Sequence, residues 1–284
     1  GFNQRLLSQL ASTSAIRRWE YCQTLDEPCC IDAVVDALHD YVANRARLEK
    51  SAGNPHYQVH LLGHGVSGVV GLFYARRYPQ HVASLTLLSV GPLPAVNWQA
   101  HYYVLRDHVP CSRERLLGQM TQLLFGKQSY QFAKTLANLL AKDLDSNLTL
   151  HSLANRTQIL PGSVSMPLLV CNGQDDVIVR SQKDIGKKTH HNIHWTDWMK
   201  PTDQLWECPG GNHFFHFHHA SLAAESIRSF WAGLAPASHS LAGKTLFALN
   251  HQKQTRQKQA RQQQALQQQT IQNKPTNIFY ASTV

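Results

Sequence analysis

The sequence has no acidic residue beyond Glu225, and no uncharged apolar run near the roughly 18 residues that span a bilayer. The second absence excludes an integral helical membrane protein. The absence of acidic residues from the C-terminal part of the chain explains most of the net charge of +9. Six of the 27 basic residues lie beyond Gly243, and residues 1–243 carry a net charge of only +3. A nearly neutral body lacks the uniform positive charge typical of a nucleic-acid-binding domain, so we expect no specific nucleic-acid partner.

Cysteine is too sparse for a disulfide scaffold, with six residues in a chain of 284. Cys29 and Cys30 are adjacent rather than spaced as CxxC, and nothing matches zinc-ligand spacing. The histidines crowded between His213 and His219 are interleaved with phenylalanines, which favours packing over metal binding. We therefore expect a cytoplasmic protein with reduced thiols, no metal and no cofactor.

Continuous apolar runs alternate along the chain with segments of helical spacing. Runs without polar alternation are typical of strands buried on both faces, so the pattern predicts an α/β fold with a mostly parallel sheet flanked by helices. Region 93–162 contains helical stretches and no convincing strand, which predicts a helical cap inserted into a domain of residues 1–236. The predicted strands are 59–62, 82–90, 167–173 and 205–208, and the main flanking helices are 31–44, 68–77 and 223–234.

Residues 237–284 have a different composition from the rest of the chain. Eleven glutamines and four basic residues lie between His251 and Asn273, with very few apolar side chains. This composition predicts a low-complexity basic tail, either a frayed helix or a disordered extension. An acidic partner is one possible role for the tail, and a solubilising extension is the alternative that its composition favours.

Three of the predicted strands are followed by residues that carry chemistry. The sequence GHGVSG occupies 63–68, GQDD occupies 173–176 and GGNH occupies 210–213. Ligands of open α/β sheets bind at the carboxyl ends of the strands, so these three segments should meet. Their order, a tight turn followed by an acid and then a histidine, resembles the α/β-hydrolase fold family over about residues 30–234.

The resemblance implies a nucleophile elbow at 63–68, and this elbow has two registers. A tight strand-to-helix turn needs small residues two positions before and two after the nucleophile. Gly63 and Ser67 provide them around Gly65, whereas a register centred on Ser67 places the branched Val69 at a crowded position. The first register is favoured, and it puts glycine where the family has a nucleophile.

In the favoured register the elbow consists of Gly63, His64, Gly65 and Gly68, the last packing the helix against the strand. Ser67 remains the alternative nucleophile, half a turn into the helix.

The resemblance also assigns the other two catalytic positions. His213 would accept a proton, and Asp176 would fix the tautomer of the imidazole ring and stabilise its charged form. Asp175 is the neighbouring alternative acid, although the family spacing favours Asp176. An open alternative is that His213 and Asp176 are inherited residues that local hydrogen bonds satisfy.

In this family a His-Gly loop after an early strand supplies amides to the oxyanion hole, the site that stabilises a developing negative charge. Gly1-Phe2 resembles the remainder of such a loop, so the resemblance implies Phe2 and Val66 as oxyanion-hole residues. We then expect a sheet that lacks its N-terminal strands, because the chain starts after them. A shortened natural variant is the alternative.

Two functions remain open at this stage. One is a catalytically impaired protein that keeps a small-molecule pocket and acts in binding or as a scaffold. The other is an active hydrolase of a small ester or acyl substrate, using Ser67 or a water molecule activated by His213. Glycine cannot attack a carbonyl carbon, and loss of a nucleophile leaves only a small residual rate, so the sequence favours the first.

Overall fold

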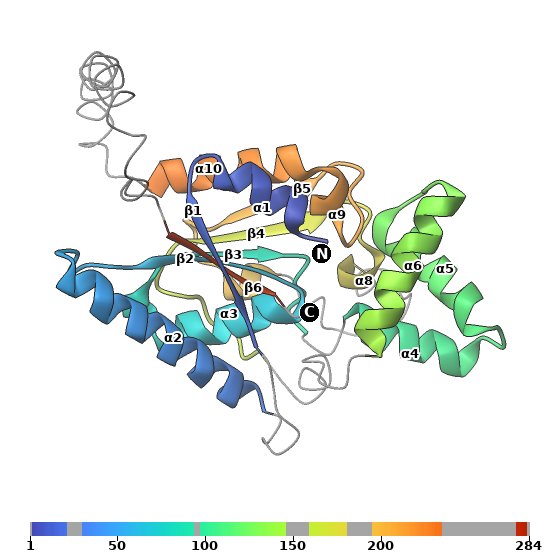
Figure 1. The fold of residues 1–284 in the computed structure, drawn as a ribbon, viewed down its shortest axis with the longest axis horizontal. Helices are drawn as coiled ribbons and strands as arrows, with labels where there is room; N and C mark the ends of the chain where they lie inside the picture. Colours follow the sequence, from blue (N-terminus) through green and yellow to red (C-terminus); the bar gives the residue numbers. More distant parts are fainter. Residues whose placement is uncertain are drawn as a thin grey trace, which may run out of the picture.

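A parallel sheet forms the centre of the computed structural model, which describes residues 2–21, 30–93, 97–145, 159–180, 195–234 and 277–282 (Figure 1). Its six strands have the order β1-β6-β2-β3-β4-β5, and all neighbouring strands are parallel. The strands are β1 (Ala15–Glu20), β2 (Val59–His64), β3 (Val82–Leu88), β4 (Leu168–Gly173), β5 (Gln204–Cys208) and β6 (Asn277–Ser282).

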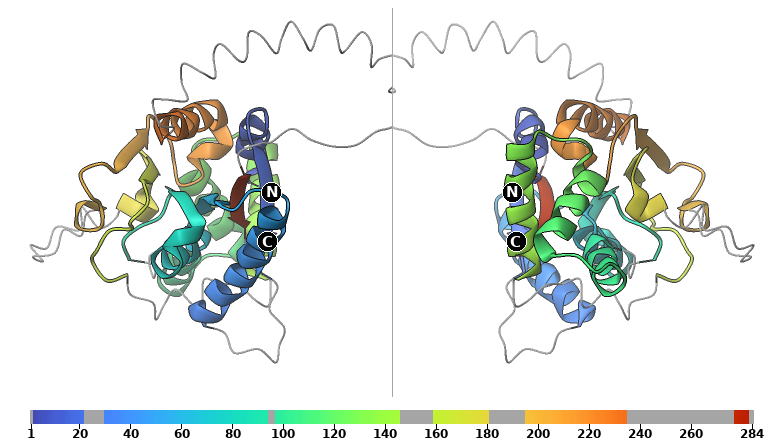
Figure 2. Two further views of the ribbon diagram at one scale, coloured as in Figure 1. Left: turned by 90° about the vertical axis from the view of Figure 1, so that its left-hand side faces the viewer. Right: turned by 90° about the vertical axis from the view of Figure 1, so that its right-hand side faces the viewer.

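Helices cover both faces of this sheet and its carboxyl edge (Figures 1 and 2). Helices α2 and α3 pack on one face, α1 and α10 pack on the other, and α4, α5 and α6 lie beyond the carboxyl ends of the strands. The longer helices are α1 (Gln4–Ala11), α2 (Ile31–Ser51), α3 (Val66–Arg77), α4 (Trp98–His108), α5 (Arg113–Phe125), α6 (Tyr130–Leu144) and α10 (Ala220–Leu234). The short ones are η1 (Pro79–His81), α8 (Val177–Arg180), η2 (Trp195–Trp198) and α9 (Phe215–His218).

The side-chain pattern explains why these elements form three layers. Every residue of β4 is buried, as expected for a central strand with a helix layer on each face. On α2 the side chains of Val34, Leu38 and Val42 lie on one stripe and pack against the sheet. Helix α10 buries Ala223 and Ile227 on the opposite face in the same way.

The predicted α/β fold with its mostly parallel sheet is confirmed, as are the four strands that the apolar runs predicted. The predicted helices are present, with α3 and α10 starting two or three residues earlier than predicted and α2 ending at Ser51 instead of residue 44, and region 93–162 contains α4, α5 and α6. Trp195 and Trp198 are buried in the core beside α3.

The C-terminal strand β6 was not predicted. Most of the predicted tail lies outside the described residues, but Asn277–Ser282 pairs with both β1 and β2 inside the sheet. The run Ile278-Phe279-Tyr280-Ala281 is apolar and suited to a strand, and the glutamine-rich composition before it obscured this signal.

Candidate functional site

The turn between β2 and α3 holds Gly65 in a backbone conformation that favours glycine. Its φ is 53° and its ψ is −127°, and Val66 begins α3 directly after it. A Cβ atom placed on Gly65 would have no heavy atom within 4 Å, whereas on Gly68 it would lie 2.4 Å from Val90 Cγ2 and on Gly63 2.7 Å from Gly68 Cα. The turn therefore requires small residues at Gly63 and Gly68 and leaves open space at Gly65.

Ser67 lies inside α3 and is only 4% exposed. Among the described residues no hydrogen bond joins it to His213.

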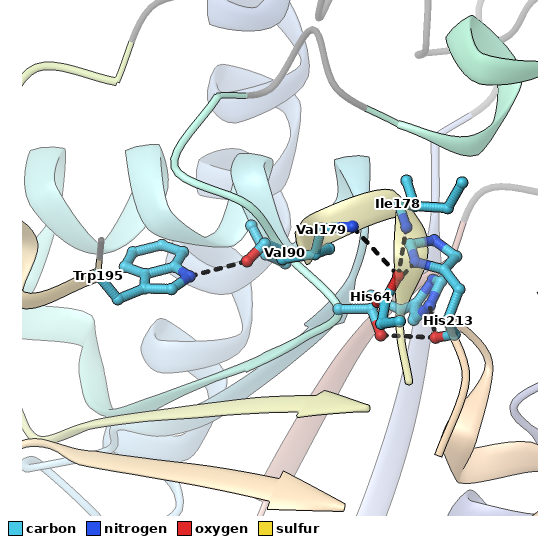
Figure 3. Close-up of polar contacts among 8 residues, drawn as sticks. His64, Val90, Ile178, Val179, Trp195 and His213 are labelled. Atoms are coloured by element: carbon cyan, nitrogen blue, oxygen red, sulfur yellow. Dashed lines mark hydrogen bonds and ion pairs between the residues drawn. The ribbon is translucent and has the colours of Figure 1, made fainter. Parts of the chain in front are cut away.

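The indole of Trp195 donates a hydrogen bond of 2.8 Å to the carbonyl of Val90 (Figure 3). This bond holds the segment after β3 in place, and the side chain of Val90 in that segment packs against Gly68.

Asp176 and His213 form a buried pair at the carboxyl ends of β4 and β5. His213 Nδ1 lies 3.0 Å from Asp176 Oδ2, and both side chains are almost fully buried. The other carboxylate oxygen accepts the backbone N–H groups of Ile178 at 2.9 Å and Val179 at 3.1 Å (Figure 3). The neighbouring Asp175 is exposed.

The environment keeps Asp176 charged. Burial alone would raise the pKa of Asp176, but the charge of His213 and the hydrogen bonds from His213, Val179 and Ile178 outweigh burial and lower it. The carboxylate therefore accepts hydrogen bonds from both sides, and it can orient the imidazole of His213 with Nδ1 as the donor.

The carbonyl oxygen of His213 accepts two further hydrogen bonds. Ser89 Oγ donates at 2.5 Å, and His64 Nε2 lies 3.3 Å from the same oxygen (Figure 3). Ser89 has a φ of 47° and is, within the described part of the chain, the one residue other than glycine with a positive φ. Backbone strain of this kind is concentrated at functional sites in proteins.

Two more histidines lie next to this pair, and of these His216 is buried and His64 is half-buried. The ring centroid of His64 lies 5.0 Å from that of His213 and 4.8 Å from that of His216. Burial, followed by the charges of His216 and His213, holds the pKa of His64 well below its ordinary value. Burial and the charge of His213 lower the pKa of His216 to about 3, and His216 Nε2 contacts Asn3 Oδ1 at 2.5 Å.

Phe2 lies at the same end of the sheet, in an aromatic cluster. Its ring centroid is 5.1 Å from that of Phe125 on α5 and 4.8 Å from that of Phe214, the residue after His213. The cluster joins the N-terminal segment to α5 and to the loop that carries His213.

The structure thus brings Gly65, Asp176 and His213 to one edge of the sheet. Sequence reasoning did not identify Ser89 or Asn3 as parts of this arrangement. Ser89 had no usable signal, because the predicted strand 82–90 includes it, whereas the observed β3 ends at Leu88 and leaves Ser89 directly after the strand. Asn3 had none, because its contact with His216 spans 213 positions of sequence.

Neither a metal cluster nor a membrane span is found in the part of the chain that the structure describes. No group of three or more His, Cys, Asp or Glu side chains there is placed to hold a metal ion. No helix there combines the length and the apolar character needed to cross a bilayer.

Two proteins of known sequence resemble this chain closely. The uncharacterized protein sll0249 of Synechocystis sp. is 41% identical over 233 residues, which cover 82% of this chain and 86% of that protein. The uncharacterized protein alr2406 of Nostoc sp. is 36% identical over 230 residues, or 81% of this chain and 85% of that protein. The chain belongs to their family. No family model matches it.

Solved structures with low sequence identity share the fold. Bromoperoxidase from Bacillus anthracis is 14% identical, with a TM-score of 0.53 over 81% of this chain and 87% of its own. An esterase from Thermogutta terrifontis is 16% identical, with a TM-score of 0.52 over 83% and 86% of the two chains. This family member therefore has the α/β-hydrolase fold.

Proposed function

We propose that this α/β-hydrolase-fold protein binds a small acyl or ester ligand without forming a covalent acyl-enzyme. The observation that carries the proposal is the turn at Gly65, which has the geometry and open space for a nucleophile but no side chain. The buried pair of Asp176 and His213 is retained beside it, so a ligand oxygen would still meet an oriented imidazole.

The proposed pocket lies between this sheet edge and helices α4, α5 and α6, which we assign as the cap. His101 on α4 supports this position, because burial, together with the charge of His213, lowers the pKa of His101. The backbone N–H of Val66, at the start of α3, and the segment at Phe2 are proposed as donors to the ligand oxygen.

The test uses a covalent probe and a non-covalent one. A fluorophosphonate, which labels activated serines, should not label the wild-type protein. Butyramide, an acyl compound that resists hydrolysis, should shift the NMR resonances of the His213 ring in the wild type but not in Gly65→Ala, where a methyl group occupies the open space. Labelling of the wild type that Ser67→Ala abolishes would overturn the proposal.

A second candidate function is hydrolysis by a water molecule that His213 activates, and the retained hydrogen bond to Asp176 favours it. In that case a small p-nitrophenyl ester would be hydrolysed without a burst of p-nitrophenol. The rate would survive Ser67→Ala and disappear in His213→Gln. Gly65→Ser tests the same geometry from the other direction, since it supplies a hydroxyl that the fluorophosphonate can label.

A further inference from the structure

The strand β6 fills a gap between two strands that do not pair with each other in the described structure. All six residues of β1 pair with Asn277–Ser282, and His60–Gly63 of β2 pair with Ile278–Ala281 on the other edge (Figure 1). Both pairings are parallel, so the carboxyl end of β6 lies beside the elbow, where Ala281 pairs with Gly63. One short segment therefore joins β1 to the rest of the sheet.

The two walls of this gap are held in place by other contacts. Leu6 and Leu10 of α1, the helix that precedes β1, are buried in one cluster with Ala223 and Ile227 of α10. Arg228 donates a hydrogen bond of 3.1 Å to the carbonyl of Gln9, and β2 pairs with β3 on its other edge. The gap thus has two positioned edges, whichever strand lies between them.

The chain connection places few limits on which copy supplies β6. Residues 235–276, 42 in number, separate α10 from β6. At most about 3.5 Å per residue, a connection of this length can reach roughly 150 Å, far more than a neighbouring strand requires. Strands pair through backbone groups. The gap can therefore form the same hydrogen bonds with residues 277–282 whether these belong to its own chain or to another copy.

We propose that the gap between β1 and β2 is a strand-binding site that also accepts residues 277–282 of a second copy. The segment in the same chain has an effective concentration in the millimolar range, so at micromolar concentration each copy fills its own gap. A gap accepts the C-terminal strand of a second copy when its own strand β6 cannot pair with β1 and β2. The partner is therefore a second copy of this chain, recognised through backbone hydrogen bonds along both edges of its C-terminal strand.

The test begins with the full-length variant Phe279→Pro. Strand β6 pairs with β1 on one edge and with β2 on the other. Proline at position 279 removes a backbone N–H group, and its ring disturbs the hydrogen bonds between the strands, so the resident strand should leave the gap. A fluorescent peptide of residues 275–284 should bind this variant with saturation at micromolar concentration. Its affinity for the intact wild-type protein should be at least tenfold lower. Equal binding to both proteins would overturn the proposal.

A cut form of the wild-type sequence covers the case in which Phe279→Pro does not fold. A specific protease site replaces residues 262–267, and the folded protein is cut there. The released C-terminal fragment should stay with the body during gel filtration and exchange for the labelled peptide. The same peptide with proline at position 279 should compete at least tenfold more weakly, because a buried backbone group then lacks its partner. Immediate separation of the fragment, or equal competition by both peptides, would refute the proposal.

Discussion

The hydroxyl of Ser89 donates a hydrogen bond of 2.5 Å to the carbonyl of His213, across 124 positions of sequence. Ser89 stands at the end of β3 with a φ of 47°, and it is 2% exposed. The bond joins the end of β3, the strand that pairs with β2, to the loop that carries His213. A residue under backbone strain thus holds the main chain of His213 at the site.

Replacing Ser89 should give an unusual order of stabilities. Ser89→Ala removes the hydrogen bond and should cost about 1–2 kcal/mol, because His64 still faces the same carbonyl. Ser89→Gly loses the same bond but is relaxed at positive φ, so it should be about 1 kcal/mol more stable than Ser89→Ala. Urea unfolding monitored by tryptophan fluorescence measures both free energies.

Ser84 provides the matched control for this order. It is a buried serine in the middle of β3, with its hydroxyl 2.7 Å from His60 Nδ1 and without a positive φ. There glycine should be less stable than alanine, since a strand interior disfavours glycine. The same order at both positions would show that backbone strain at Ser89 has no measurable effect.

Stability should fall as the pH drops below about 6.5, and His216 should contribute to that loss. Its pKa is about 3 in the folded protein because of burial and the charge of His213, against an ordinary histidine pKa of 6.5. The unfolded chain therefore takes up a proton that the folded chain does not, over the range between these two values. Between pH 7.5 and pH 5 this difference amounts to about 2 kcal/mol.

The variant His216→Gln isolates this effect. Its amide nitrogen can still donate toward Asn3, but the side chain no longer titrates. Urea unfolding at pH 7.5 and pH 5 should show a smaller difference than in the wild type. His56→Gln, at an exposed position, controls for the loss of a histidine as such. An unchanged pH dependence in His216→Gln would contradict the assignment.

Strands β2, β3 and β4 were predictable from the sequence because each is a buried, continuous apolar run, and helices α2 and α10 were predictable because each has a buried stripe. Helix α1 and strand β1 were not predicted, since β1 is a short strand with two arginines and no fully buried residue. The small residues of the turn between β2 and α3 were predictable for a steric reason, since neither Gly63 nor Gly68 has room for a Cβ atom. Strand β6 was not predictable, because its pairing partners in β1 and β2 lie more than 200 positions away and its apolar run is part of a strand of only six residues. The bond from Ser89 to His213 was hidden because it spans 124 positions of sequence and because Ser89 lies inside the predicted strand 82–90.

Two glycines at the turn between β2 and α3, Gly63 and Gly68, should not tolerate alanine. In Gly63→Ala the new Cβ would lie 2.7 Å from backbone atoms of Gly68 and Ser67, which have little freedom to move apart. In Gly68→Ala it would lie 2.4 Å from Val90 Cγ2 and 2.9 Å from the carbonyl oxygen of Gly63. Each change should cost about 2 kcal/mol or more in unfolding free energy, as overpacking does in a dense core.

Gly118 in α5 is the control, because a Cβ there has no neighbour within 4 Å and its φ is not positive. Gly118→Ala should stabilise the protein by about 0.5–1 kcal/mol through helix propensity. Wild-type stability in Gly63→Ala would mean that strand β2 and helix α3 are not packed as closely as described.

Asp203 should be more important to stability than the surface ion pairs. Its buried carboxylate accepts backbone N–H groups of Leu168 and Lys200, each at 3.0 Å, and the ammonium of Lys200 at 2.5 Å. Asp203→Ala leaves the N–H of Leu168, at the start of β4, without its partner, and should lower the free energy of unfolding by about 3 kcal/mol.

Asp36 is the control. Its carboxylate lies 3.1 Å from Arg77, and both side chains are about half exposed, so Asp36→Ala should lower the free energy of unfolding by less than about 1 kcal/mol. Urea unfolding at pH 7.5 compares the two variants, and equal losses would show that the Asp203 carboxylate does not hold the first residue of β4.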